Sequence, residues 1–217
     1  MSAKSTLEHL KTTGIIATIT SEIYNDNLLE VADALLASPI LAVEIVRDSP
    51  VTAYAIEQVR KRAGDNMLVG VYGAENPDQM AMFAEAGAQF ASSQWDFMLP
   101  MIAKAKELDI VYLPTIHSAS QSLMATHAGC PFQKIRDDID IEHLEPIQAR
   151  IAETDFQSHL IFNQIPLEFV DAAFESDAAL VCVNDLYTDK NQKMSDLITR
   201  ARIARSLYLT KAHQSSA

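Results

Sequence analysis

Two charged residues of this 217-residue chain interrupt strand-like stretches: Lys134 in PFQKIRDD and Glu44 in LAVEIV. A lysine amine that loses water has a lowered pKa, and the free amine can attack a ketone to form a Schiff base. A drop of about three units from the ordinary lysine pKa would supply free amine at neutral pH. A buried carboxylate must either pair or function, so Glu44 is a candidate proton carrier.

Side chains alternate along a strand, so Phe132, Lys134 and Arg136 share one face. We expect Lys134 to point into the protein, where the charge of Arg136 would lower its pKa further. A structural ion pair between Lys134 and Glu44 is the simpler alternative, and a surface lysine at a strand edge is another.

Short apolar segments, many of them rich in β-branched residues, recur along the chain and are typical of buried parallel strands. The predicted strands are 14–20, 41–46, 66–72, 88–93, 110–116, 132–135, 159–164 and 178–185. Helical patterns lie between them, among others at 26–38, 51–64, 76–88 and 195–209. The charged region 136–157 is expected to hold a loop followed by one helix.

This alternation predicts an α/β fold with a parallel sheet. Eight strands fit a single (β/α)8 TIM barrel with an N-terminal helix, spanning residues 1–210, with 211–217 as a frayed tail. An open doubly wound sheet is the alternative, but no GxGxxG follows the first strand to support a dinucleotide fold.

The composition narrows the possible partners. A net charge of −12 argues against nucleic acid and anionic membranes, which both require a basic surface. The two cysteines, Cys130 and Cys182, lack metal-ligand spacing and are expected in the core, and the histidines form no metal motif. We find no signal-peptide pattern and no transmembrane segment, so a cytoplasmic protein without a metal or other cofactor is expected.

Chemistry in a TIM barrel takes place at the C-terminal ends of the strands. The polar residues at or just beyond the predicted strand ends are Thr18, Thr20, Glu44, Arg47, Asp48, Gly73, Ser92, Ser93, His117, Lys134, Arg136, Asn163, Gln164, Asn184 and Asp185. They are the candidates for a binding site.

From TGIIATIT to VNDLY the chain resembles the 2-keto-3-deoxy-6-phosphogluconate and 4-hydroxy-2-oxoglutarate (KDPG/KHG) aldolases. The stretch NPDQMAMFAEAGAQFASS carries the best local match. The resemblance implies a class I aldolase on a (β/α)8 barrel, usually a trimer, that cleaves a keto acid to pyruvate and an aldehyde. It places the Schiff-base lysine at Lys134 and the acid/base glutamate at Glu44.

The chain departs from the family pattern elsewhere in the site. Asp48 takes the place of the arginine that holds the substrate carboxylate, and Arg47 stands one residue early, where a β-bulge could restore it. Gly73 replaces a threonine that contacts pyruvate. Asn163, Gln164, Asn184 and Asp185 replace the glycines of the phosphate site, which predicts a non-phosphorylated substrate.

The expected function is therefore cleavage of a 2-keto-4-hydroxy acid, with Lys134 as nucleophile and Glu44 as proton shuttle. Arg47 or Arg136 would hold the carboxylate, and His117 would line the pocket. The alternatives are an aldolase-like barrel without this activity, which binds a keto acid or effector or serves as a structural subunit, and a different Schiff-base or isomerase activity on the same barrel.

Overall fold

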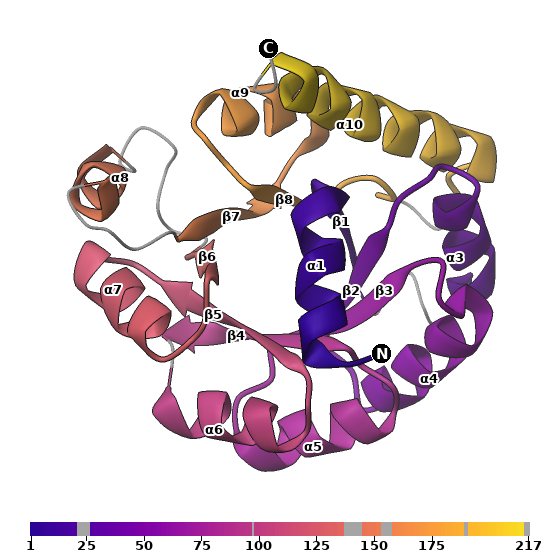
Figure 1. The fold of residues 1–217 in the computed structure, drawn as a ribbon. Coiled ribbons are helices and arrows are strands. Elements are labelled where there is room, and N and C mark those ends of the chain that lie inside the picture. The colour runs from indigo at the N-terminus through magenta and orange to yellow at the C-terminus, as the bar shows by residue number, and fades with distance from the viewer. Residues whose placement is uncertain (21–26, 97, 137–144, 153–157, 189–190, 215–217) are drawn as a thin grey trace.

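The chain folds as a closed barrel of eight parallel strands in sequential order (Figure 1). The computed structural model describes residues 1–20, 27–96, 98–136, 145–152, 158–188 and 191–214. The strands are β1 (Ile15–Ile19), β2 (Ala42–Val46), β3 (Leu68–Tyr72), β4 (Phe90–Asp96), β5 (Val111–Ile116), β6 (Phe132–Ile135), β7 (His159–Ile165) and β8 (Leu180–Val183). Pairing of β1 with β8 closes the barrel, which confirms the predicted TIM-barrel fold.

Helices surround the barrel on the outside, and α1 crosses the end that faces the viewer in Figure 1. They are α1 (Ala3–Thr13), α3 (Leu28–Leu36), α4 (Thr52–Ala63), α5 (Pro77–Glu85), α6 (Leu99–Glu107), α7 (Ala119–His127), α8 (Glu145–Ala152), α9 (Val170–Glu175) and α10 (Met194–Gln214), with a short 3-10 helix η2 (Leu167–Phe169) before α9. None of the helices in the described parts of the chain is both long and apolar enough to cross a membrane.

All eight predicted strands are present, with bounds that differ by up to three residues at either end. The cap predicted by Asn76 and Pro77 is also present, since the Asn76 side chain accepts a hydrogen bond from the Gln79 N–H at the start of α5. The C-terminus differs from the expectation, because α10 continues through Gln214 and makes residues 211–214 helical. Of the charged region 136–157, helix α8 is described, whereas 137–144 and 153–157 lie outside the described residues.

Alternate side chains of the strands fill the barrel interior. The part of the interior near the N-terminal ends of the strands is apolar, and Leu10 of α1 packs against it. The apolar residues from the strands are Ile16, Ala42, Leu68, Phe90, Val111, Leu113, Phe132, Ile161, Leu180 and Cys182. Gly70 lies in the same interior, where a Cβ atom would approach the Phe90 ring to 2.3 Å, so only glycine leaves room for this ring.

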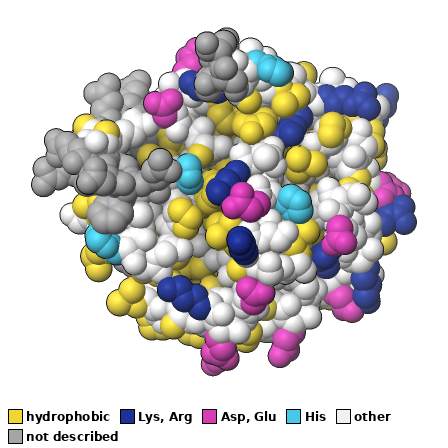
Figure 2. Space-filling view, viewed as in Figure 1, with side chains coloured by type: hydrophobic (Ala, Val, Ile, Leu, Met, Phe, Trp, Pro, Cys, Tyr) yellow, Lys and Arg dark blue, Asp and Glu magenta, His cyan; other side chains and the backbone are white. Residues whose placement is uncertain are grey.

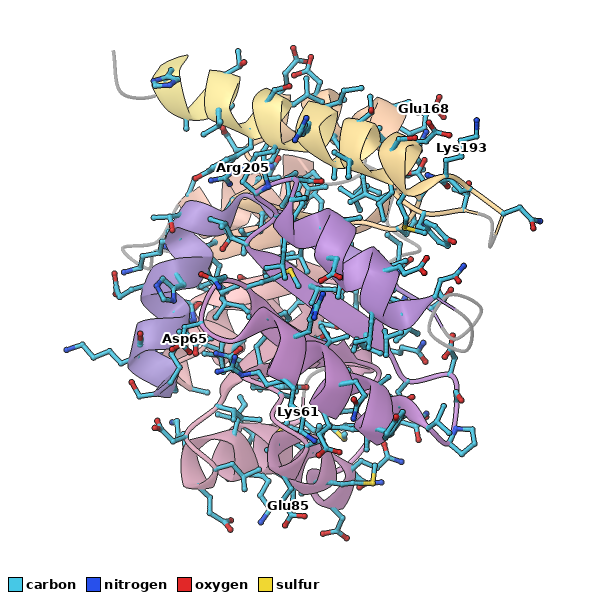
Figure 3. The ribbon with its side chains drawn as sticks, turned by 90° about the vertical axis from the view of Figure 1, so that its right-hand side faces the viewer. Lys61, Asp65, Glu85, Glu168, Lys193 and Arg205 are labelled. Carbon is cyan, nitrogen blue, oxygen red and sulfur yellow. The ribbon has the colours of Figure 1, made fainter. Side chains whose placement is uncertain are left out.

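Helix α10 holds the N-terminal helix in place as well as covering β1. The Arg205 guanidinium donates hydrogen bonds to the carbonyls of Thr12 and Thr13, where α1 ends. A cation at a helix C-terminus also interacts favourably with the helix dipole. Figure 3 shows Arg205 pointing from α10 toward the N-terminal part of the chain.

Candidate active site

Lys134 and Glu44 meet inside the barrel from opposite walls. Lys134 comes from β6 and Glu44 from β2, and both side chains are fully buried. The Lys134 Nζ donates to Glu44 Oε2 at 2.5 Å. The inward direction predicted by alternation is therefore correct, and the lysine is not a surface residue.

Three further residues of the interior complete the surroundings of this pair. The Thr18 hydroxyl donates to Glu44 Oε1 at 3.0 Å, and Asn163 Oδ1 accepts from Lys134 Nζ at 3.2 Å. The ring of Tyr72 lies with its centroid 4.5 Å from Nζ, which is a cation–π distance. Together these groups compensate the charges of a buried ion pair with direct contacts.

The expected lowering of the pKa of Lys134 is not what the site produces. Burial is the largest influence and lowers the pKa, but the negative charge of Glu44 and its hydrogen bond to Nζ raise it above the ordinary value of 10.5. The sequence prediction derived the pKa from burial and the charge of Arg136. It considered Glu44 as an ion-pair partner but did not include the raising effect of its charge. The raised pKa favours the ammonium form of Lys134, which donates its hydrogen bond to Glu44.

Cys182 and Tyr72 are site neighbours that the sequence reasoning did not identify. Burial, followed by the charge of Glu44, raises the pKa of the Cys182 thiol well above 9.0, so the thiol remains protonated beside the pair. Strand alternation was the available signal, because Cys182 shares a face with Leu180 and Tyr72 shares one with Gly70.

Arg47 lies on the outer side of the barrel. The β2–β3 register is regular up to the pair Val46 and Tyr72, and the Arg47 N–H donates to the Tyr72 carbonyl at 2.8 Å. The bulge that would turn Arg47 inward is therefore absent from this ladder. Its guanidinium donates to the Gly73 carbonyl at 2.7 Å and forms an ion pair with Glu75.

A cavity of about 360 Å³ lies beside Arg47, between α4 and α5. Asp48, the residue at the family's arginine position, also lines this cavity. Gly73 adopts a left-handed backbone (φ 100°), and its N–H donates to the Ser92 carbonyl at 2.9 Å. This conformation strains any residue with a Cβ atom, so Gly73 fits its position as glycine.

Arg136 and His117 follow neighbouring strands at the same end of the barrel. Both are half-buried. The Arg136 N–H donates to the Ile116 carbonyl at 3.0 Å, and the His117 N–H donates to Gln121 Oε1 at 2.9 Å. Continued alternation from Lys134 places Arg136 on the inward side of β6, one step closer to the mouth.

The ends of β7 and β8 hold the residues that replace the family's glycines. Gln164 has a left-handed backbone (φ 55°) at an irregularity in the β7–β8 pairing. Asp185 Oδ1 accepts from the Leu167 N–H at 2.8 Å, and Asp185 Oδ2 accepts from Arg200 at 2.7 Å. The Asp185 carboxylate is therefore an internal partner of these groups.

The described residues contain no cluster of three or more His, Cys, Asp or Glu side chains that could hold a metal ion. On the face shown in Figure 2, basic and acidic side chains are scattered among one another and among apolar ones. The reactive groups of the candidate site are therefore the buried Lys134 amine and the neighbouring Glu44 carboxyl group.

Comparisons with known proteins agree with this geometry. The family model described as KDPG and KHG aldolase matches residues 7–136, which is more than half of the chain. The KHG/KDPG aldolase of Escherichia coli K12 is 28% identical over 126 residues, so the match spans 58% of this chain and 58% of that relative. This is less than two thirds of the curated relative's length.

Solved structures show the same fold. A 2-keto-3-deoxy-6-phosphogluconate aldolase from Zymomonas mobilis has a TM-score of 0.79 at 16% identity, covering 95% of this chain and 98% of the other. A KDPG aldolase from Legionella pneumophila, captured with pyruvate as a covalent carbinolamine, has a TM-score of 0.71 at 18% identity, with 93% and 95% coverage.

Proposed function

We propose that this chain, which belongs to the KDPG and KHG aldolase family, cleaves a 2-keto-4-hydroxy acid through a Schiff base on Lys134. The observation that carries the proposal is the fully buried Lys134–Glu44 pair, whose nitrogen and oxygen lie 2.5 Å apart. The products are pyruvate and an aldehyde, and the reaction is that of a carbon–carbon lyase. The protein's own amine supplies the electron sink, so no cofactor is included in this proposal.

The first task of Glu44 is to release the amine. Because the pKa of Lys134 is raised, the free amine forms by transfer of a proton from Nζ to the adjacent carboxylate. The amine then attacks the C2 carbonyl to form a carbinolamine. Glu44 returns its proton to the carbinolamine hydroxyl, which leaves as water and gives a protonated imine, so Glu44 is ionised again.

Cleavage then uses the same carboxylate in its ionised form. Glu44 takes the proton of the C4 hydroxyl, the C3–C4 bond breaks, and its electron pair moves toward the imine nitrogen to form an enamine. The aldehyde leaves, Glu44 delivers its proton to C3 of the enamine, and water hydrolyses the imine to release pyruvate and restore Lys134. Thr18, which donates to Glu44, orients this carboxylate.

Arg136 is the better candidate for the group that holds the substrate carboxylate. It follows Lys134 on the same side of β6, whereas Arg47 is engaged by Gly73 and Glu75 on the outer side. An arginine suits a planar carboxylate because it can donate two parallel hydrogen bonds. His117 and Gly73 are proposed to line the mouth, and the substrate is proposed to lack a phosphate group.

We also propose a homotrimer in the cytoplasm. The trimer rests on family membership, and the reducing compartment agrees with two free, buried cysteines, Cys130 and Cys182. A second function, binding of a keto acid without cleavage, is favoured by the outward position of Arg47, which leaves one fewer group to orient a substrate.

Borohydride trapping tests the proposal. The protein is incubated with pyruvate, reduced, and analysed by intact mass and peptide mapping. We expect one pyruvate-derived adduct on Lys134, absent in Lys134→Met and retained in the matched control Lys104→Met, whose lysine is a surface ion-pair partner of Glu107. A folded wild-type protein without an adduct, beside a working control aldolase, would reject the Schiff-base proposal.

A further inference from the structure

The ends of β7 and β8 form the part of a TIM barrel that frequently binds phosphate, together with the N-terminus of a short helix. In this chain the short helix is η2, which begins at Leu167 directly after β7 and continues into α9. A phosphate at this place would need the N–H groups of the helix start and a neighbouring cation.

In this chain the N–H group of Leu167 and the neighbouring cation, Arg200, already donate hydrogen bonds to Asp185. Asp185 Oδ1 accepts from the Leu167 N–H at 2.8 Å, and Asp185 Oδ2 accepts from Arg200 Nη2 at 2.7 Å. The same guanidinium donates to the Asp185 carbonyl from Nε at 3.1 Å and from Nη2 at 2.8 Å. A substrate phosphate would have to displace this carboxylate and would be repelled by its charge.

The residue before Asp185 offers a different kind of contact. Asn184 Oδ1 is buried and has no hydrogen-bond partner. Buried polar atoms are normally satisfied, so an acceptor without a partner at the end of a barrel strand needs an explanation. Alternation along β8 places Asn184 on the side of Cys182, about 6.6 Å farther toward the mouth.

We infer that the substrate's end remote from the keto acid is uncharged and carries a hydroxyl group, which hydrogen-bonds to Asn184 while Asp185 excludes phosphate. A hydroxyl both donates and accepts, so it matches the carboxamide. This inference rests on the proposed function and specifies its substrate class: a hydroxylated 2-keto acid without a phosphate. Asn184 is its specificity-determining residue.

The test runs the reaction toward bond formation, with pyruvate and three aldehydes of similar length. Glyceraldehyde carries hydroxyls, glyceraldehyde 3-phosphate adds the phosphate, and propanal lacks both. For the wild type we expect kcat/KM with glyceraldehyde to exceed the other two by at least about tenfold, because a site built for a hydroxyl rejects analogues without it.

Two variants of Asn184 identify the contact. Asn184→Leu removes the polar atoms at similar volume and should lower kcat/KM for glyceraldehyde to the level of propanal. Asn184→Ser keeps a hydrogen-bonding oxygen and should restore part of the preference. A wild type that prefers the phosphorylated aldehyde, or a preference unaffected in Asn184→Leu, would overturn the inference.

A binding measurement separates this inference from the aldolase proposal. The backbone amide signal of Leu167 is followed by NMR while inorganic phosphate is added, without any catalytic step. We expect no saturable shift in the wild type, whether or not pyruvate forms an adduct on Lys134. A saturable shift would show that the wild type accepts phosphate beside Asp185 and would overturn the inference even if the adduct forms.

Discussion

Each member of the buried Lys134–Glu44 pair depends on the other for its charge compensation. Both side chains are fully buried, so removal of either partner leaves a charge without water or counter-ion. Breaking such a pair typically costs about 3–5 kcal/mol, whereas replacing both partners with apolar residues is often neutral or stabilising by about 1–4 kcal/mol. The pair is therefore a costly feature for stability, and the proposed catalysis would account for it.

We predict that Lys134→Met alone lowers the free energy of unfolding by about 3–5 kcal/mol, because Glu44 then remains buried and unpaired. The double variant Lys134→Met with Glu44→Leu should recover most of this loss. Urea denaturation with circular dichroism measures both. A double variant less stable than the single one would show that the pair stabilises the fold beyond its mutual compensation.

The catalytic candidates could be read from the sequence, but their environment could not. Alternation and the family motif were sufficient for Lys134 and Glu44, whose inward direction follows from the strands that carry them. The direction of the Lys134 pKa shift was predicted wrongly because the effect of Glu44, named only as a possible ion-pair partner, was not weighed against burial. The direction of the Arg47 side chain was ambiguous because a shift of one residue at the end of a strand turns a side chain from the interior to the outer face.

Strands β3 and β4 show how close packing requires a particular residue type at one position. Gly70 of β3 leaves the space that the Phe90 ring of β4 occupies in the barrel interior. This large and small pairing fills part of the barrel interior. Gly70 is also the ladder partner of Glu44 on β2, so this packing lies directly beside the candidate site.

We predict that Gly70→Ala destabilises the protein by about 1–3 kcal/mol, because the new methyl group overlaps the Phe90 ring and forces neighbouring atoms to shift. Thermal or urea unfolding provides the measurement. The double variant Gly70→Ala with Phe90→Leu should recover part of the loss by releasing the space. Equal stability of Gly70→Ala and wild type would contradict the contact.

His159, the first residue of β7, links two strands through its ring. It stacks on Phe132 of β6 with centroids 4.8 Å apart. Burial, and then the positive charge of Lys11, lowers the pKa of His159 below its ordinary value of 6.5. The unfolded chain therefore binds a proton more readily than the folded one.

It follows that the His159 contribution to stability is fully present above pH 6.5 and is lost as the pH falls from there toward the lowered folded-state pKa. We predict that His159→Phe, which keeps an aromatic ring, shows a shallower loss of unfolding free energy than wild type across this interval. His213→Gln, at an exposed histidine of α10, should retain the wild-type slope. Identical slopes for all three proteins would contradict the prediction.

The existence of the elements was more predictable than their ends. Apolar strands and capped helices are local patterns, and Asn76 with Pro77 marked the start of α5 correctly. The end of α10 was placed too early because TKAHQ carries no clear helical signal of its own. The short helix η2 was also missed, since a three-residue 3-10 turn leaves no periodicity to detect.

At the scale of the whole molecule, the proposed trimer leads to a direct measurement. Several large apolar side chains are exposed on the isolated chain, including Tyr54 at 62% and Leu99 at 61%. In a trimer, side chains of this kind could be covered by a neighbouring subunit. We predict a particle of three times the 23.9 kDa chain mass in mass photometry or analytical ultracentrifugation. A single species at the monomer mass over the same concentrations would contradict the trimer.

Closure of the barrel by β1 and β8 also has a consequence for how the protein is made. Ile15 pairs with Val181, so the ladder that closes the sheet joins the earliest strand to the last. Chains emerge from the ribosome N-terminus first, at about 5–20 residues per second. The nascent chain therefore carries an open sheet edge on β1 until β8 has been synthesised. Unpaired strand edges attract other chains, so this barrel is a natural client for chaperones during translation.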